Sequence, residues 1–159
     1  MRKQKFWRPG RCQAHGQSGL KHEHLRHGNA PFRSCRSSSK NRDNAQRFYS
    51  QILPAIGFSV DKSGEKWGLF EAQDNVAVDF FGFTEEADHQ PNGNRIAFWA
   101  DSREVVDRVA GVLRQAGAKN IEGPELCVEY SPGYYAVFFE DPDGNKLEVC
   151  HRASVTVAE

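Results

Sequence analysis

Two carboxylates, Asp79 and Glu148, are the side chains of this sequence whose placement best suits chemistry. Asp79 follows Phe70 by nine residues, and Glu148 follows Phe139 by the same nine. Each phenylalanine is followed directly by an acid and then by a turn. A carboxylate fixed on a strand can hold a divalent cation or move a proton. The repeated spacing predicts that Asp79 and Glu148 occupy equivalent places in two similar units.

A hairpin near the C-terminus must position Glu148. Aromatic and branched residues at 135–139 favour a strand, and Asp141-Pro142-Asp143-Gly144 has the composition of a tight turn. On the return strand Leu147 and Val149 point to one face, so Glu148 must point to the other. We therefore expect Glu148 to project away from the apolar layer.

Helices and further strands are predicted from residue 43 onward. Two helical patterns end at Gly57 and Gly117, the first capped by Asn41 or Asp43 and the second by a capping box of Asp101 and Glu104. The strand-like runs cover 58–61, 67–72, 76–83 and 95–101, and a loop is expected over 123–133.

The order of these elements repeats. A helix and three strands are followed by a linker and then by a strand, a helix and three strands. The repeat therefore predicts a duplicated α+β unit in which the strand before the first helix is irregular or missing.

Residues 1–38 differ in composition from the rest of the chain. The first 40 residues carry ten Lys or Arg and one acid, whereas the remaining 119 carry 11 basic and 20 acidic residues. The N-terminal segment is also poor in apolar residues and shows no sustained period, which predicts a disordered basic tail. A shifted reading frame or a misassigned start is the interpretation we favour for its unusual composition.

The basic residues, cysteines and histidines of this tail suggest three functions. Dispersed cations can bind nucleic acid without sequence preference, but the acidic remainder of the chain opposes this, so nucleic acid is an unlikely partner. A zinc site built from Cys12, Cys35 and the intervening histidines matches no compact finger spacing. A targeting peptide remains an alternative, although no amphipathic helix supports it.

The composition also bounds the location and redox state. No apolar run reaches the length of a membrane span, and the N-terminus lacks the apolar core of a secretory signal. The four cysteines form no CxxC pair and are too sparse for a disulfide framework. These features predict a soluble cytoplasmic protein without a membrane partner.

Residues 39–152 resemble the glyoxalase, bleomycin-resistance and extradiol-dioxygenase superfamily, also called vicinal oxygen chelate proteins. The similarity is carried by RIAFWADSREVVDRVAGVLRQAGA, by EYSPGYYAVFFEDPDGNKLEVCH and by the first helix with its FY pair and LxxxGF-like ending. It implies two paired βαβββ modules, residues 39–84 and 95–152, forming a cup-shaped mixed sheet, with a C-terminal tail at 153–159. It also implies a homodimer and a small-molecule ligand in the cup.

The resemblance assigns roles to three residues. Metal-dependent relatives take ligands from the first and last strand of each module, so Glu148 and Asp79 become candidate metal ligands and Glu148 a candidate catalytic residue. The cofactor implied is a divalent metal (Fe, Mn, Zn or Ni), or none. Arg95 stands where the family pattern has histidine, and a guanidinium cannot ligate a metal.

Two functions therefore stay open. In the first, a metal held partly by Glu148 polarises the vicinal oxygens of a substrate, as in a lyase or dioxygenase. In the second, the cation of Arg95 replaces the metal and pairs with the acids, and a metal-free cup sequesters a small aromatic or polar compound. Trp99 and Tyr130 are further candidate ligand-binding residues, as parts of an aromatic wall.

Overall fold

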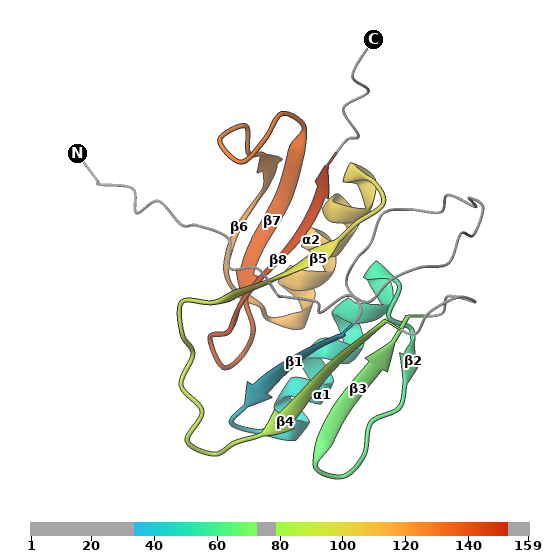
Figure 1. The fold of residues 1–159 in the computed structure, drawn as a ribbon, viewed down its shortest axis with the longest axis vertical. Coiled ribbons are helices and arrows are strands. Elements are labelled where there is room, and N and C mark those ends of the chain that lie inside the picture. The colour runs from blue at the N-terminus through green and yellow to red at the C-terminus, as the bar shows by residue number, and fades with distance from the viewer. Residues whose placement is uncertain (1–33, 73–78, 153–159) are drawn as a thin grey trace, which may run out of the picture.

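The computed structural model describes residues 34–72 and 79–152 and contains two βαβββ modules (Figure 1). Module one comprises β1 (Ser34–Ser39), α1 (Arg42–Ile52), a 3-10 turn η1 (Leu53–Ile56), β2 (Val60–Asp61), β3 (Trp67–Glu71) and β4 (Phe80–Glu85). Module two comprises β5 (Arg95–Trp99), α2 (Arg103–Ala116), β6 (Lys119–Leu126), β7 (Tyr134–Glu140) and β8 (Lys146–Arg152). The α+β fold predicted from the sequence is confirmed.

The four strands of each module form one mixed sheet with the same strand order. The orders are β1-β4-β3-β2 in module one and β5-β8-β7-β6 in module two. In each sheet the first and last strands of the module run parallel, and the remaining pairs are antiparallel. The equal order identifies the two modules as structural repeats.

The first strand of module one is present, so the prediction that it is irregular or missing is wrong. All six residues of β1 pair with β4, from Ser34 opposite Phe80 to Ser39 opposite Glu85. The sequence SCRSSS hides this strand because β1 is an edge strand, which needs no apolar residues on its outer face. Only Cys35 packs against the main core. Module one therefore begins at Ser34 rather than at residue 39. The rest of the predicted N-terminal tail, 1–33, and the predicted C-terminal tail, 153–159, lie outside the described residues.

Both helices begin and end with sequence signals of the expected kind. Asn41 caps α1, and its side chain accepts a hydrogen bond of 2.9 Å from the backbone N–H of Asn44. The N-cap of α2 is Ser102 rather than the predicted Asp101. Gly57 and Gly117 end the two helical segments with positive φ, a conformation that glycine adopts without strain.

One continuous core joins the two modules. The ring of Phe98 on β5 packs against Phe58 and Phe81 of module one, with centroid distances of 6.0 and 5.4 Å. Phe48 of α1 lies 6.4 Å from Phe139 of β7. Helices α1 and α2 contact each other and cover one face of the sheets (Figure 1). The helices therefore lie on the core side, and the opposite face of each sheet is left without a helix.

We call these opposite faces open face A, in module one, and open face B, in module two. Strand alternation places Arg36, Trp67, Leu69, Gly82 and Thr84 on open face A. It places Arg95, Trp99, Tyr134, Phe138 and Glu148 on open face B.

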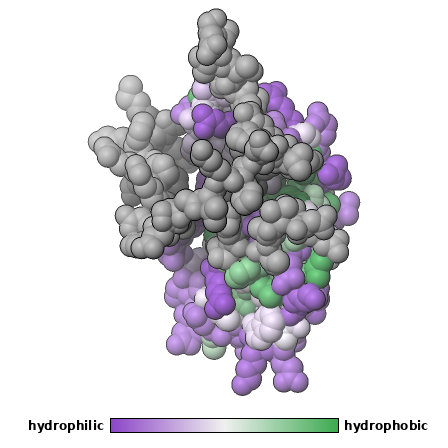
Figure 2. All heavy atoms as spheres, turned by 45° about the vertical axis from the view of Figure 1, so that its right-hand side comes forward, coloured by the Kyte–Doolittle hydropathy of each residue, from purple (hydrophilic) through white to green (hydrophobic). Residues whose placement is uncertain are grey.

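Figure 2 shows mainly hydrophilic residues on the described part of one side, with a small apolar area among them. None of the helices in 34–72 and 79–152 is long and apolar enough to cross a membrane.

Candidate functional site

Glu148 lies at the centre of open face B and is 7 % exposed. Its Oε1 accepts a hydrogen bond from the Tyr134 hydroxyl, and its Oε2 lies 3.7 Å from Nη1 of Arg95. A carboxylate that is this buried is costly unless it is paired or hydrogen-bonded. Here each of its two oxygens has a partner. Glu148 is therefore a polar centre that is already engaged by two side chains.

Arg95 reaches Glu148 across an aromatic surface. Its guanidinium carbon lies 4.6 Å from the centroid of the Phe138 ring, a cation–π geometry. Arg95 lies on β5 and Phe138 on β7, and Glu148 on β8 separates them in the sheet. The predicted pairing of Arg95 with Glu148 is thus present, with Phe138 as an additional support for the guanidinium.

Aromatic rings extend this surface toward the loop before β7. The Tyr130 ring stacks on Tyr134 with a centroid distance of 5.3 Å and lies 6.1 Å from Phe138. Tyr130 is 54 % exposed, so one side of its ring remains accessible. Trp99 on β5 is 38 % exposed on the same open face. Trp99 on β5 and Tyr130 in the loop before β7 are therefore accessible aromatic groups at open face B.

Burial keeps the nearby hydroxyl and thiol groups protonated. The pKa of Tyr134 is raised well above its ordinary value, first by burial and then by its bonds to Cys150 and Glu148. Burial likewise raises the pKa of the Cys150 thiol to about 11, with the Glu148 charge adding to the effect. At neutral pH, Tyr134 therefore acts as a hydrogen-bond donor to Glu148, and Cys150 is a neutral thiol of low nucleophilicity.

The strand registers do not place Asp79 at the position equivalent to Glu148. In module two Phe139 pairs with Leu147, the residue before Glu148. In module one Phe70 pairs with Phe81, the residue before Gly82. Gly82 is therefore the counterpart of Glu148. Counting nine residues failed because the connection between β3 and β4 is longer than the turn between β7 and β8.

The position of Asp79 and the pairing of β1 with β4 agree with this reassignment. Asp79 precedes β4, where its backbone oxygen accepts a hydrogen bond of 2.9 Å from the N–H of Ala72. Arg36 pairs with Gly82 just as Ala97 pairs with Glu148. Asp79 thus lies just before a strand of module one, whereas Glu148 lies within a strand of module two, and the two positions are not equivalent.

The residues of this chain fit the metal of metal-dependent relatives poorly. Arg95 has no free lone pair and Gly82 has no side chain, so neither can replace the ligands that the family pattern has at these places. Within the described ranges, no three His, Cys, Asp or Glu side chains form a group that could hold a metal ion. We therefore derive no chemical step through a metal at Glu148.

Sequence reasoning missed the partners that Tyr134 and Phe138 provide to this site. The available signal was strand alternation, because Tyr134, Ala136 and Phe138 must share the face of β7 that neighbours Glu148 on β8. Nothing in the spacing of the sequence indicated that the Tyr134 hydroxyl reaches the carboxylate.

The turn between β7 and β8 is anchored to module one. The carboxylate of Asp141, which is 1 % exposed, accepts hydrogen bonds from the hydroxyl of Tyr49 at 2.8 Å and from three groups of its own turn. Asp143 accepts a bond of 2.6 Å from the Ser39 hydroxyl, and the Asn145 side chain donates to the Ser38 backbone oxygen at 2.9 Å. These bonds fix the hairpin that carries Glu148 against β1 and α1.

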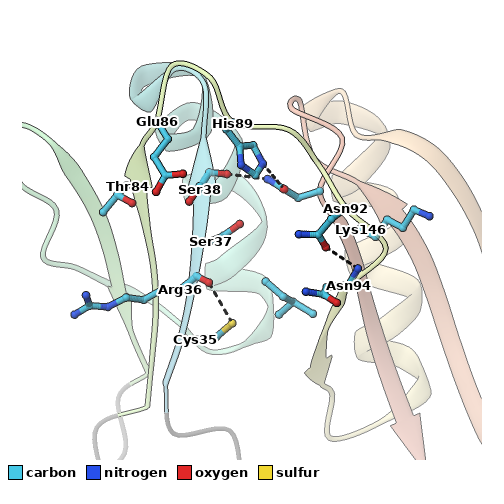
Figure 3. A pocket seen from close by; sticks show the side chains of 12 residues that line it. Cys35, Arg36, Ser37, Ser38, Thr84, Glu86, His89, Asn92, Asn94 and Lys146 are labelled. Atoms are coloured by element: carbon cyan, nitrogen blue, oxygen red, sulfur yellow. Dashed lines mark hydrogen bonds between the residues drawn. The ribbon is translucent and has the colours of Figure 1, made fainter. Parts of the chain in front are cut away.

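A polar cavity of about 490 Å³ lies beside this junction, between β1 and the linker that leads to β5 (Figure 3). Ser37, Asn92 and Asn94 line it, and His89 closes one end through a 2.7 Å hydrogen bond to Asn145. The Asn145 side chain in this cavity bonds both to His89 and to the backbone oxygen of Ser38, across the module junction. We therefore regard this cavity as part of that junction, distinct from open face B.

Both the sequence and the fold of this chain are similar to those of known proteins. Residues 39–149 match the family model described as the Glyoxalase/Bleomycin resistance protein/Dioxygenase superfamily. A glyoxalase/bleomycin resistance protein from Albidiferax ferrireducens T118 has a similar structure, with a TM-score of 0.61 and 23% identity over 78% of this chain and 100% of that chain. The search of curated proteins gave no match.

Two further solved structures share the fold. A glyoxalase/bleomycin resistance protein/dioxygenase family enzyme from Burkholderia phytofirmans PsJN has a TM-score of 0.59 and 18% identity over 78% of this chain and 100% of that chain. The fosfomycin resistance protein FosX from Mesorhizobium loti has a TM-score of 0.54 and 15% identity over 83% and 97% of the two chains. Because the family model matches residues 39–149, which are most of this chain, the chain belongs to the glyoxalase/bleomycin resistance/dioxygenase superfamily.

Proposed function

We propose that this protein binds a small planar molecule with polar substituents on open face B, without a metal. The observation that carries the proposal is the engagement of Glu148 by both Arg95 and Tyr134. Each carboxylate oxygen can accept a second hydrogen bond, so the pair still offers a ligand one acceptor and one cation side by side. The accessible ring of Tyr130 offers a surface for stacking. A metal-dependent lyase or dioxygenase is the competing proposal. It is favoured less, because Arg95 and Gly82 supply no side-chain ligand for a metal.

Catechol is a suitable probe because it is planar and carries two hydroxyl groups. One hydroxyl can donate to Glu148 while the other accepts from Arg95, and the ring can stack on Tyr130. We expect saturable binding in the presence of EDTA, followed by calorimetry. Replacing Arg95 with methionine or Tyr130 with alanine is expected to weaken catechol binding by about tenfold, the cost of one charge-assisted hydrogen bond or one stacking contact.

The control is Tyr135→Phe on β7. Tyr135 faces the helix side, where its hydroxyl donates to Asp107 at 2.7 Å. Its removal takes away a tyrosine hydroxyl without touching open face B, so catechol binding should be unchanged. Equal binding to the native, Arg95→Met and Tyr130→Ala proteins would show that catechol does not occupy open face B.

We also propose a homodimer, in which the open faces are partly covered by a second copy. Trp67, Trp99, Leu126, Val128 and Tyr130 are large apolar residues that are 38–64 % exposed in the single chain. Strands β1 and β5 also lie at sheet edges. Sedimentation equilibrium should give twice the mass of one chain, which is 17.9 kDa. A single-chain mass at every concentration would refute the dimer.

A further inference from the structure

A second cavity, which we call cavity A, lies on open face A of module one. Its volume is about 410 Å³, within the usual size range of small-molecule sites. Trp67 and Leu69 of β3 form its apolar wall, Gly82 of β4 forms its floor, and Arg36 and Lys66 lie at its margin.

Gly82 accounts for the hollow. Arg36 on β1, Gly82 on β4 and Leu69 on β3 stand in one row across the sheet. A Cβ at Gly82 would lie 3.3 Å from the backbone oxygen of Gly68, 3.5 Å from the Leu69 side chain and 4.0 Å from Cγ of Arg36. The glycine therefore leaves a gap between the aliphatic stems of its two neighbours. The equivalent place in module two is filled by the carboxylate of Glu148.

The charge of cavity A is unbalanced. Arg36 extends away from the polar cavity at the module junction and over β4 (Figure 3), on the opposite side of β1 from Cys35. In the described part of the chain, neither Arg36 nor Lys66 forms an ion pair with a carboxylate. In module two, by contrast, the acid at the glycine position neutralises Arg95.

The positive charge beside cavity A is opposite in sign to the net charge of residues 41–159. Residues 41–159 carry 20 acidic and 11 basic residues, so cations near acids are the expectation there. Two cations beside a cavity with apolar walls, neither of them ion-paired with an acid of residues 34–72 or 79–152, form a site for a negative group on an apolar body. The exposed Trp67 ring, 42 % accessible, suits a planar apolar body.

We infer that cavity A binds a small aromatic anion, whose ring lies against Trp67 and Leu69 and whose carboxylate, sulfonate or phosphate group is held by Arg36 and Lys66. The site differs in chemistry from open face B, where the cation is already paired with an acid. Module one would thus select a negatively charged aromatic ligand, and module two a polar one of lower charge.

The probe for this inference is naphthalene-2-sulfonate, with 2-naphthol as the uncharged counterpart. Calorimetry should show saturable binding of the sulfonate and much weaker binding of the naphthol. The double variant Arg36→Gln, Lys66→Gln is expected to weaken sulfonate binding by about tenfold, because two charge-assisted contacts are lost. Trp67→Leu should weaken binding of both probes. All replaced residues are exposed, so thermal melting should confirm that each variant remains folded.

Arg108→Gln is the matched control, since Arg108 is an exposed arginine on α2, far along the chain from cavity A. It should bind the sulfonate as the native protein does. Failure of the native protein to bind, or equal binding to the double variant, would overturn the inference. Loss of sulfonate binding in Arg95→Met alone would place the anion on open face B, and would overturn the inference while leaving the proposal for open face B intact.

Discussion

Replacing Asp141 with alanine is expected to lower the free energy of unfolding by about 4 kcal/mol, because four hydrogen bonds to one buried carboxylate are lost together. The Tyr49 hydroxyl and two backbone N–H groups of the turn would then have no acceptor. For a chain of this length the change corresponds to a melting temperature lower by about 12 °C. Chemical denaturation followed by circular dichroism measures it.

The control for this variant is Asp88→Ala. Asp88 is an exposed acid of the linker between the modules, so its removal should change stability by less than about 0.5 kcal/mol. The isosteric Asp141→Asn keeps one acceptor oxygen and should fall between the two. Equal stability of the Asp141→Ala and Asp88→Ala proteins would show that the turn does not depend on this carboxylate.

Replacing Arg95 with methionine is expected to cost about 2 kcal/mol of stability. The change leaves Glu148, which is 7 % exposed, with only the Tyr134 hydroxyl as partner, and it removes the cation above the Phe138 ring. We place the cost below that of a fully buried pair because the Arg95 side chain is 32 % exposed and solvent screens part of the interaction.

The double variant Arg95→Met, Glu148→Gln separates pairing from simple loss of contacts. Removing the charge of Glu148 should relieve the penalty of the unpaired carboxylate, so the two changes should be less than additive by about 1 kcal/mol. Arg108→Met on the exposed surface of α2 should have little effect. Strict additivity of the two single variants would show that Arg95 and Glu148 do not interact in solution.

The parts of the fold predicted from the sequence are those with strong local signals. Both helices have a capping residue and a terminal glycine, and the β7–β8 hairpin has alternation and turn residues in one short segment. The alternation also indicated that Glu148 faces away from the core. These features depend on neighbours in sequence, and a single sequence records them.

The features that escaped prediction depend on partners distant in sequence. β1 is a strand because it pairs with β4, about 46 residues later, and its serines carry little strand preference of their own. Gly82 could be matched to Glu148 only through the pairing of neighbouring strands. The bond between Tyr49 and Asp141 joins residues 92 positions apart. Residue spacing along the chain cannot reveal such contacts.

Open face B is proposed to bind its ligand through Arg95, Glu148 and Tyr130, without a metal. The most direct measurement is the affinity for catechol after exhaustive treatment with EDTA, compared with the affinity after addition of Mn²⁺, Fe²⁺, Zn²⁺ or Ni²⁺. We expect the same dissociation constant in every condition, and the same dependence on Arg95. Binding that is lost with EDTA, and is restored by a metal in the native protein but not in Glu148→Gln, would contradict it.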